Sequence, residues 1–129
     1  MTSKMRQVRV GPEEGRRREP RLLPGNMVHA HPVDSLLRVL ELRNLSLGGF
    51  SIETDGEISP GLEKRFEFQA MNGLSVVASA VAVHCRRDES SRGWISGWRF
   101  VVDPDAERGV HALVDFLTST LQFDEDQAS

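Results

Sequence analysis

The sequence has one cysteine, few aromatic residues and no long hydrophobic run. A single cysteine, Cys85, cannot form a disulfide within one chain, which is typical of a reducing compartment. Because aromatic residues make up only 6% of the chain, the core is expected to consist mostly of valine, leucine, isoleucine and alanine. No stretch approaches the roughly 20 apolar residues of a membrane-spanning helix, and no apolar segment of a signal peptide follows the basic N-terminus. We therefore expect a cytoplasmic protein that does not insert into membranes.

An excess of positive charge is also missing. The chain carries 16 lysines and arginines against 19 acidic residues, which gives a formal net charge of −3. General binding to nucleic acid polymers requires a broadly basic face, so this class of partner is not expected. Any site for an anion must therefore be a local cluster of arginines.

The residue combinations of common catalytic centres are absent from the sequence. It contains no set of four metal ligands, no nucleophile beside a base and no pair of carboxylates at a suitable spacing. His29 and His31 supply two imidazoles, which do not make a zinc site. Cys85 follows His84 directly, and adjacent residues of a strand face opposite ways, so Cys85 is expected to be a core thiol. We expect neither an enzyme nor a cofactor.

The length of 129 residues predicts one domain, and turn signals divide it into short strands. One such signal is the hairpin sequence Asn72-Gly73. Short antiparallel strands with even punctuation predict a mainly β protein, a small six-stranded barrel. The strands are expected near residues 27–31, 36–42, 49–54, 65–70, 74–87 and 93–102.

A helix is expected after the last strand, with Asp103 as the N-cap and Pro104 at the first helical position. One helical face is apolar, as expected of a helix that packs on the barrel. This apolar stripe consists of Val110, Leu113, Val114, Leu117 and Leu121. The predicted organisation is a flexible tail (1–15), one domain (16–121) and a C-terminal tail (122–129). The domain divides into an arginine linker (16–25), the barrel (26–102) and the helix (103–121).

Residues 44–49 contain the pattern N-x-S-x-x-G between two apolar runs. Asn44 and Ser46 lie two apart, so on an extended backbone they point to the same face. Gly48 and Gly49 remove two side chains beside them, which allows a sharp turn or close contact with a ligand. The pattern therefore predicts a surface that binds something.

A second motif lies upstream, where Arg17 and Arg21 form R-x-x-x-R in a segment that Pro20 biases away from helix. The ordered pair of motifs, before this pattern of strands, resembles the PilZ domain family, bacterial receptors for cyclic di-GMP. The resemblance covers roughly residues 15–121. It implies the barrel and helix expected above, and it implies that Arg17 and Arg21 clasp the ligand. Arg16 precedes the motif, and in the family an arginine there is associated with a stacked pair of ligand molecules instead of one.

The resemblance also implies roles for the second motif. Asn44 would contact a guanine edge and Ser46 the polar backbone of the ligand, while Gly48 and Gly49 would leave room beside them. The family usually has aspartate at position 44, and an amide offers one acceptor oxygen where a carboxylate offers two. We therefore expect somewhat weaker binding than with aspartate.

His84 is a further candidate for ligand contact. The strand expected at residues 74–87 has valines and Cys85 on one face and alanines on the other, and His84 shares the face of Ala82. A flat ring on that face could stack on a base, and members of the resembled family often contact the ligand near this point.

Structural explanations remain open for the same residues. The arginines can form an ordinary solvated linker, and residues 46–49 can form an ordinary turn. Trp94 and Trp98 have the same parity, which is more typical of packing than of base stacking. Two functions follow. The first is a cyclic di-GMP receptor that orders its linker and passes the signal to a downstream protein. The second is an adaptor that binds a motility, pilus or polysaccharide-machinery protein without nucleotide.

Overall fold

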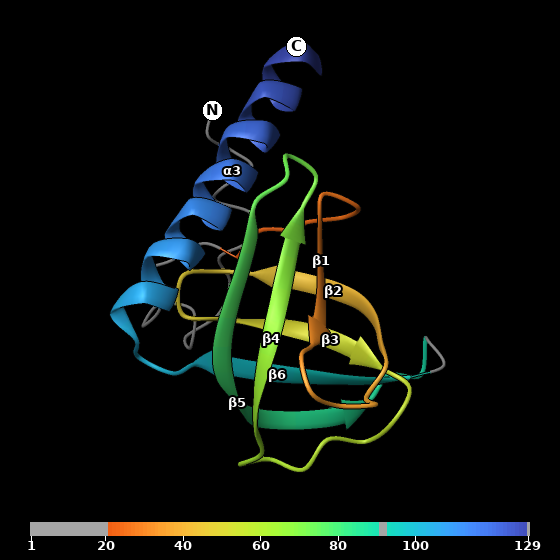
Figure 1. Cartoon of the computed structure of the whole chain (residues 1–129). Helices are drawn as coiled ribbons and strands as arrows, with labels where there is room; N and C mark the ends of the chain where they lie inside the picture. Colours follow the sequence, from red (N-terminus) through yellow and green to blue (C-terminus); the bar gives the residue numbers. More distant parts are fainter. Residues whose placement is uncertain (1–20, 91–92, 129) are drawn as a thin grey trace, which may run out of the picture.

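The computed structural model describes residues 21–90 and 93–128, with side chains described up to residue 120. Six strands form one sheet in the order β1-β4-β5-β6-β3-β2, and every neighbouring pair is antiparallel. The end strands β1 and β2 contact each other, so the sheet curls into a nearly closed barrel (Figure 1). The elements are β1 Val28–Pro32, β2 Val39–Leu45, β3 Gly49–Thr54, β4 Glu63–Ala70, β5 Ser75–Arg87, β6 Trp94–Phe100 and helix α3 Pro104–Ala128. The predicted fold class is confirmed.

The barrel interior combines aliphatic residues with a central aromatic cluster. Most of the buried hydrophobic side chains are valine, leucine, isoleucine or alanine, as the composition predicts. At the centre, Phe50 makes edge contacts with Phe66 and Phe68, each at 5.1 Å between ring centroids. Trp98 stacks parallel to Phe50 at 6.0 Å. The aromatic residues are few, but they fill the middle of the core, and Trp98 is a packing residue as expected.

Helix α3 starts at the predicted position. The Oδ1 atom of Asp103 accepts hydrogen bonds from the backbone N–H groups of Asp105 (3.0 Å) and Ala106 (3.5 Å), so Asp103 is the N-cap. The buried face of the helix consists of Val110, Leu113, Val114 and Leu117. The helix packs on β5 and continues beyond the predicted end at residue 121, so its C-terminal turns extend past the strands (Figure 1). Of the helices that the structure describes, none has the length and hydrophobicity to cross a membrane.

Strand β2 begins later than predicted. The sequence pattern favours a strand at residues 36–42, whereas the observed strand is Val39–Leu45. Leu36 is instead fully exposed in a loop, in which the Ser35 hydroxyl accepts a hydrogen bond from the backbone N–H of Leu37. The later end of β2 matters for the site, because it places Asn44 within the sheet and not after it.

Candidate functional site

The segment that carries Arg21 is attached to the end of β2. Leu22 and Leu45 form an antiparallel bridge, in which each backbone N–H donates to the other residue's carbonyl, at 2.8 and 2.9 Å. Both leucine side chains are buried in the core. Because side chains alternate along extended backbone, the flanking residues Arg21, Asn44 and Ser46 lie on the outer side. The bridge thus brings part of the first motif beside the second.

Four strands each contribute one residue to a row on the outer face. Asn44 of β2 pairs with Ser51 of β3, and Ser51 pairs with Gly97 of β6. Gly97 in turn pairs with His84 of β5. Residues directly opposite one another on antiparallel strands present their side chains to the same face. Asn44 and His84 therefore lie at the two ends of this row. The two residues between them are small: Ser51 has only a hydroxymethyl side chain, and Gly97 has none.

A second row lies beside the first. Gly49 of β3 pairs with Arg99 of β6, and Arg99 pairs with Val81 of β5. The backbone N–H of Ser46 donates to the carbonyl of Gly49 at 2.8 Å, which extends this row to the end of β2. The second row therefore has a glycine in its middle and a guanidinium group on β6.

A cavity of about 250 Å³ lies over these two rows. It exists because the central positions carry small side chains while longer side chains surround them. Gly48, Gly49 and Gly97 contribute to its lining, together with the apolar residues Phe50, Val83 and Trp98. Its polar lining consists of Arg21, Asn44, Ser46, Ser51, His84 and Arg99. All predicted site residues that fall within the described part of the chain thus line one cavity.

The hydroxyl of Ser46 organises the turn between β2 and β3. Its Oγ accepts hydrogen bonds from the backbone N–H groups of Gly48 and Gly49, both at 3.3 Å, and donates to the carbonyl of Gly49 at 3.3 Å. Ser46 is only 4% exposed. These hydrogen bonds directly support the interpretation of residues 46–49 as a turn. By binding the backbone of Gly48 and Gly49, Ser46 shapes the rim of the cavity.

Gly49 is required for the close packing of β3 on β6. A Cβ atom on Gly49 would overlap the carbonyl oxygen of Trp98 and lie 3.2 Å from the Cα of Arg99. Both contacts involve the backbone of β6, which cannot rotate away as a side chain can. β6 therefore occupies the place that a side chain at position 49 would take, and Gly49 also lines the cavity, so its role beside a ligand stays a prediction.

The prediction that His84 shares the face of Ala82 is wrong, although His84 does line the cavity. A bulge between Ala82 and His84 interrupts the alternation of β5, so Ala82 faces the core while His84 is exposed on the outer face. A Cβ atom on Gly97 would overlap Nε2 of His84 and lie 2.7 Å from its Cε1. The imidazole therefore covers Gly97 at the edge of the cavity. The bulge also turns Cys85 toward the core, where its Sγ accepts a hydrogen bond from the backbone N–H of Ile58 at 3.4 Å.

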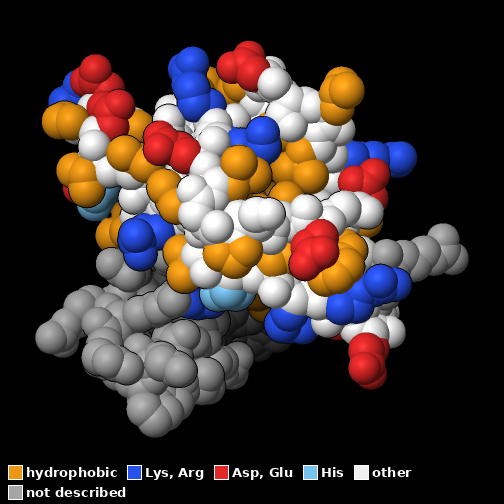
Figure 2. All heavy atoms as spheres, turned by 90° about the horizontal axis from the view of Figure 1, so that it is seen from below, with side chains coloured by type: hydrophobic (Ala, Val, Ile, Leu, Met, Phe, Trp, Pro, Cys, Tyr) orange, Lys and Arg blue, Asp and Glu red, His pale blue; other side chains and the backbone are white. Residues whose placement is uncertain are grey.

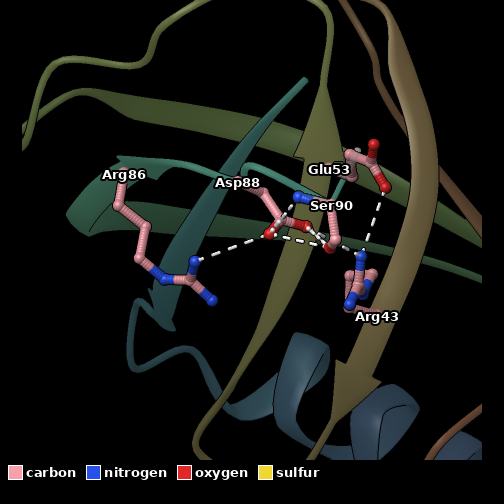
Figure 3. Close-up of polar contacts among 5 residues, drawn as sticks. All are labelled: Arg43, Glu53, Arg86, Asp88 and Ser90. Carbon is pink, nitrogen blue, oxygen red and sulfur yellow. Dashed lines mark hydrogen bonds and ion pairs between the residues drawn. The ribbon is translucent and has the colours of Figure 1, made fainter. Parts of the chain in front are cut away.

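Charged residues farther along β2, β3 and β5 form an ion-pair network (Figure 3). Arg43 pairs with Glu53 at 3.3 Å and with Asp88 at 3.8 Å. Arg86 lies 4.0 Å from the same Asp88 carboxylate, which also accepts hydrogen bonds from Ser90. These two guanidinium groups are therefore neutralised by neighbouring carboxylates.

The paired histidines of β1 do not belong to the cavity. His31 lies 3.3 Å from Glu67, whose pKa is lowered first by the hydrogen bond from the Ser75 hydroxyl at 2.6 Å and then by the one from Gln69. Across residues 21–90 and 93–120, no group of three or more His, Cys, Asp or Glu side chains is arranged to hold a metal ion.

Two predicted residues, Arg16 and Arg17, lie outside the described residues. Conversely, the motifs did not include Ser51, Gly97 or Arg99, which line the cavity. The alternation in Gly97-Trp98-Arg99 was an available signal, because it places a glycine and an arginine on one face with a core tryptophan between them.

Comparison with known proteins gives one family. A model of the PilZ domain matches residues 15–119, which is most of the chain. No match to the chain was found among curated proteins.

Proposed function

The chain belongs to the PilZ domain family, and we propose on this basis that it is a receptor for cyclic di-GMP. In this proposal the ligand orders the arginine linker, and the complex passes the signal to a partner protein. PilZ domains are binding and adaptor modules and not enzymes, so no catalytic role is proposed. The observation that carries the proposal is the bridge between Leu22 and Leu45, which brings Arg21 to the same cavity as Asn44.

The chemistry of the cavity suits a guanine nucleotide. A guanidinium group can donate two parallel hydrogen bonds to guanine O6 and N7 or to a phosphate. Arg21 supplies that group, and Asn44 supplies an amide for a guanine edge. Each charge-assisted contact contributes roughly 1.5–3 kcal/mol. Ordering the linker costs roughly 1–2 kcal/mol per residue. Several contacts are therefore needed, and Arg17 is proposed to supply another.

The size of the cavity bears on how the ligand is held. At about 250 Å³ it is smaller than the roughly 300–1,000 Å³ of typical small-molecule pockets. We infer that it holds one guanine with its adjoining phosphate, while the linker covers the rest of the ligand. Arg16 is the residue proposed to favour a second, stacked ligand molecule.

Calorimetric titration of the full chain with cyclic di-GMP tests the proposal directly. We expect saturable heat with micromolar affinity and a stoichiometry of one or two ligands per chain. The linker is expected to become protected from amide hydrogen exchange in the complex, because its backbone is ordered there. The absence of heat at about 100 μM ligand, a concentration well above such an affinity, would rule out the receptor function.

The ring of His84 gives a second prediction for the same site. In the variant Gly97→Ala, the new methyl group takes the place of the imidazole. Because the imidazole can rotate away, the barrel is expected to keep its stability within about 1 kcal/mol. If the ring stacks on a base, binding is expected to weaken about tenfold, since such stacking contributes roughly 1–3 kcal/mol. Titration calorimetry of the variant measures the loss.

A double-mutant cycle separates the ring from the added methyl group. In a His84→Ala background, Gly97→Ala is expected to cause no further loss of binding, because the ring that it displaces is already gone. An equal loss in both backgrounds would mean that the methyl group itself obstructs the ligand, and the stacking role of His84 would be withdrawn.

Exposed valines favour the adaptor as the second candidate function. On the outer face of β5, Val77 is 40% exposed and Val83 is 48% exposed, and Val83 also lines the cavity. Hydrophobic side chains gather near the centre of the face seen from below, with charged side chains around them (Figure 2). Such a surface suits a protein partner. Capture of a motility, pilus or polysaccharide-machinery protein that is unaffected by cyclic di-GMP and by Arg21→Ala would favour this function.

A further inference from the structure

Arg99 is an arginine of the cavity that neither motif contains. Its neighbours across the sheet are Gly49 and Val81, so the adjacent strands present no carboxylate directly opposite it. The neighbouring residue Trp98 is buried in the core, which fixes the outward direction of Arg99. The guanidinium group is therefore carried by a rigid central strand and lies exposed at the edge of the cavity.

The charge environment of Arg99 differs from that of the arginines farther along the outer face. Arg43 and Arg86 are each held by a carboxylate (Figure 3). Within residues 21–90 and 93–120, Arg99 forms no ion pair and no side-chain hydrogen bond. The guanidinium group of an arginine is positively charged. Arg99 thus brings to the cavity a positive charge that no described residue neutralises.

We propose that Arg99 binds a phosphate of the cyclic dinucleotide, as a cationic contact that belongs to the sheet. This inference rests on the proposed function. The bridge of Leu22 to Leu45 places Arg21 opposite Ser46, so Arg21 extends the second row, with Ser46 and Gly49 between it and Arg99. Three strand spacings correspond to on the order of 14 Å between their Cα atoms. Two long side chains at this separation can contact different groups of one ligand that lies between them.

The rigidity of β6 gives Arg99 a different role from the linker arginines. In the proposed function the ligand orders Arg16 and Arg17, whereas the backbone of Arg99 is already fixed by pairing on both sides. Arg99 therefore contributes a contact that requires no ordering of its own backbone. Its loss should weaken binding without preventing the linker from becoming ordered once ligand is bound.

The test is calorimetric titration of cyclic di-GMP into the full chain and three variants. Arg99→Ala is expected to weaken binding about tenfold and to reduce its dependence on salt. Arg99→Lys should stay within about threefold of the unmodified protein, since lysine also binds phosphate as a point charge. Arg65→Ala is the matched control, because Arg65 is also exposed and lies on the outer face of β4, outside this cavity. The affinity of the Arg65→Ala variant for cyclic di-GMP should equal that of the unmodified protein.

Each other outcome overturns a definite part of the inference. If the unmodified protein binds and Arg99→Ala binds equally well, the role of Arg99 is wrong while the receptor function stands. If Arg99→Lys is as weak as Arg99→Ala, the contact needs the planar fork of arginine, and the inference that Arg99 acts on the phosphate as a point charge is wrong. If the unmodified protein does not bind, the receptor function and this inference fail together. Thermal unfolding of each variant shows whether the fold is retained.

Discussion

Alanine at position 49 is expected to destabilise the barrel by about 2–3 kcal/mol. The added methyl group would overlap the carbonyl oxygen of Trp98 and lie 3.1 Å from its carbonyl carbon. Because these atoms are backbone, relief requires that β3 and β6 separate where they pair beside the cavity. Urea unfolding of the variant, followed by tryptophan fluorescence, measures the change in the free energy of unfolding.

Gly56→Ala is the matched control for this prediction. Gly56 lies in the connection after β3, and a Cβ atom there would meet nothing within 4 Å. The same chemical change is therefore expected to alter stability by no more than about 0.5 kcal/mol. Similar losses in both variants would mean that Gly49 is costly to replace for a reason other than the close approach of β6.

Local sequence patterns predicted the structural features that depend on interactions between residues close together in the sequence. The turn of residues 46–49 and the start of β3 follow from a hydroxyl and two glycines that satisfy one another's backbone groups. The start of α3 follows from Asp103, whose carboxylate caps the first turn. The alternation that defines the inner face of β5 holds as far as Ala82. These features need no knowledge of the rest of the fold.

The unpredicted features of the site depend on how distant strands pair. The bulge in β5 switches the face of His84, and it is seen only in the register of β5 on β6. The pattern around Trp98 places Gly97 and Arg99 on one face, but only the pairing of β6 with β3 brings that face beside Asn44. Pairing between elements far apart in sequence is what a one-dimensional pattern does not determine.

Replacement of Arg21 by alanine is expected to weaken binding of cyclic di-GMP by about 100-fold or more, beyond the range of a micromolar titration. The side chain lines the cavity beside the motif of β2, so the change removes a charged fork from the proposed site. The backbone bridge of Leu22 to Leu45 does not involve the Arg21 side chain, and it should persist. Arg17→Ala, outside the described residues, is expected to act in the same direction.

Arg38→Ala serves as the control for this loss, because Arg38 is also exposed but does not line the cavity. Its affinity should equal that of the unmodified protein. Arg21→Lys separates charge from geometry: it keeps the charge but not the two parallel donors, so it should recover only part of the binding. Unchanged affinity in a folded Arg21→Ala protein would contradict the proposed contact of Arg21 and the placement of the ligand at this cavity, while the receptor function would stand. The cavity would then be a feature of the turn between β2 and β3, and the ligand would have to bind at another place on the chain.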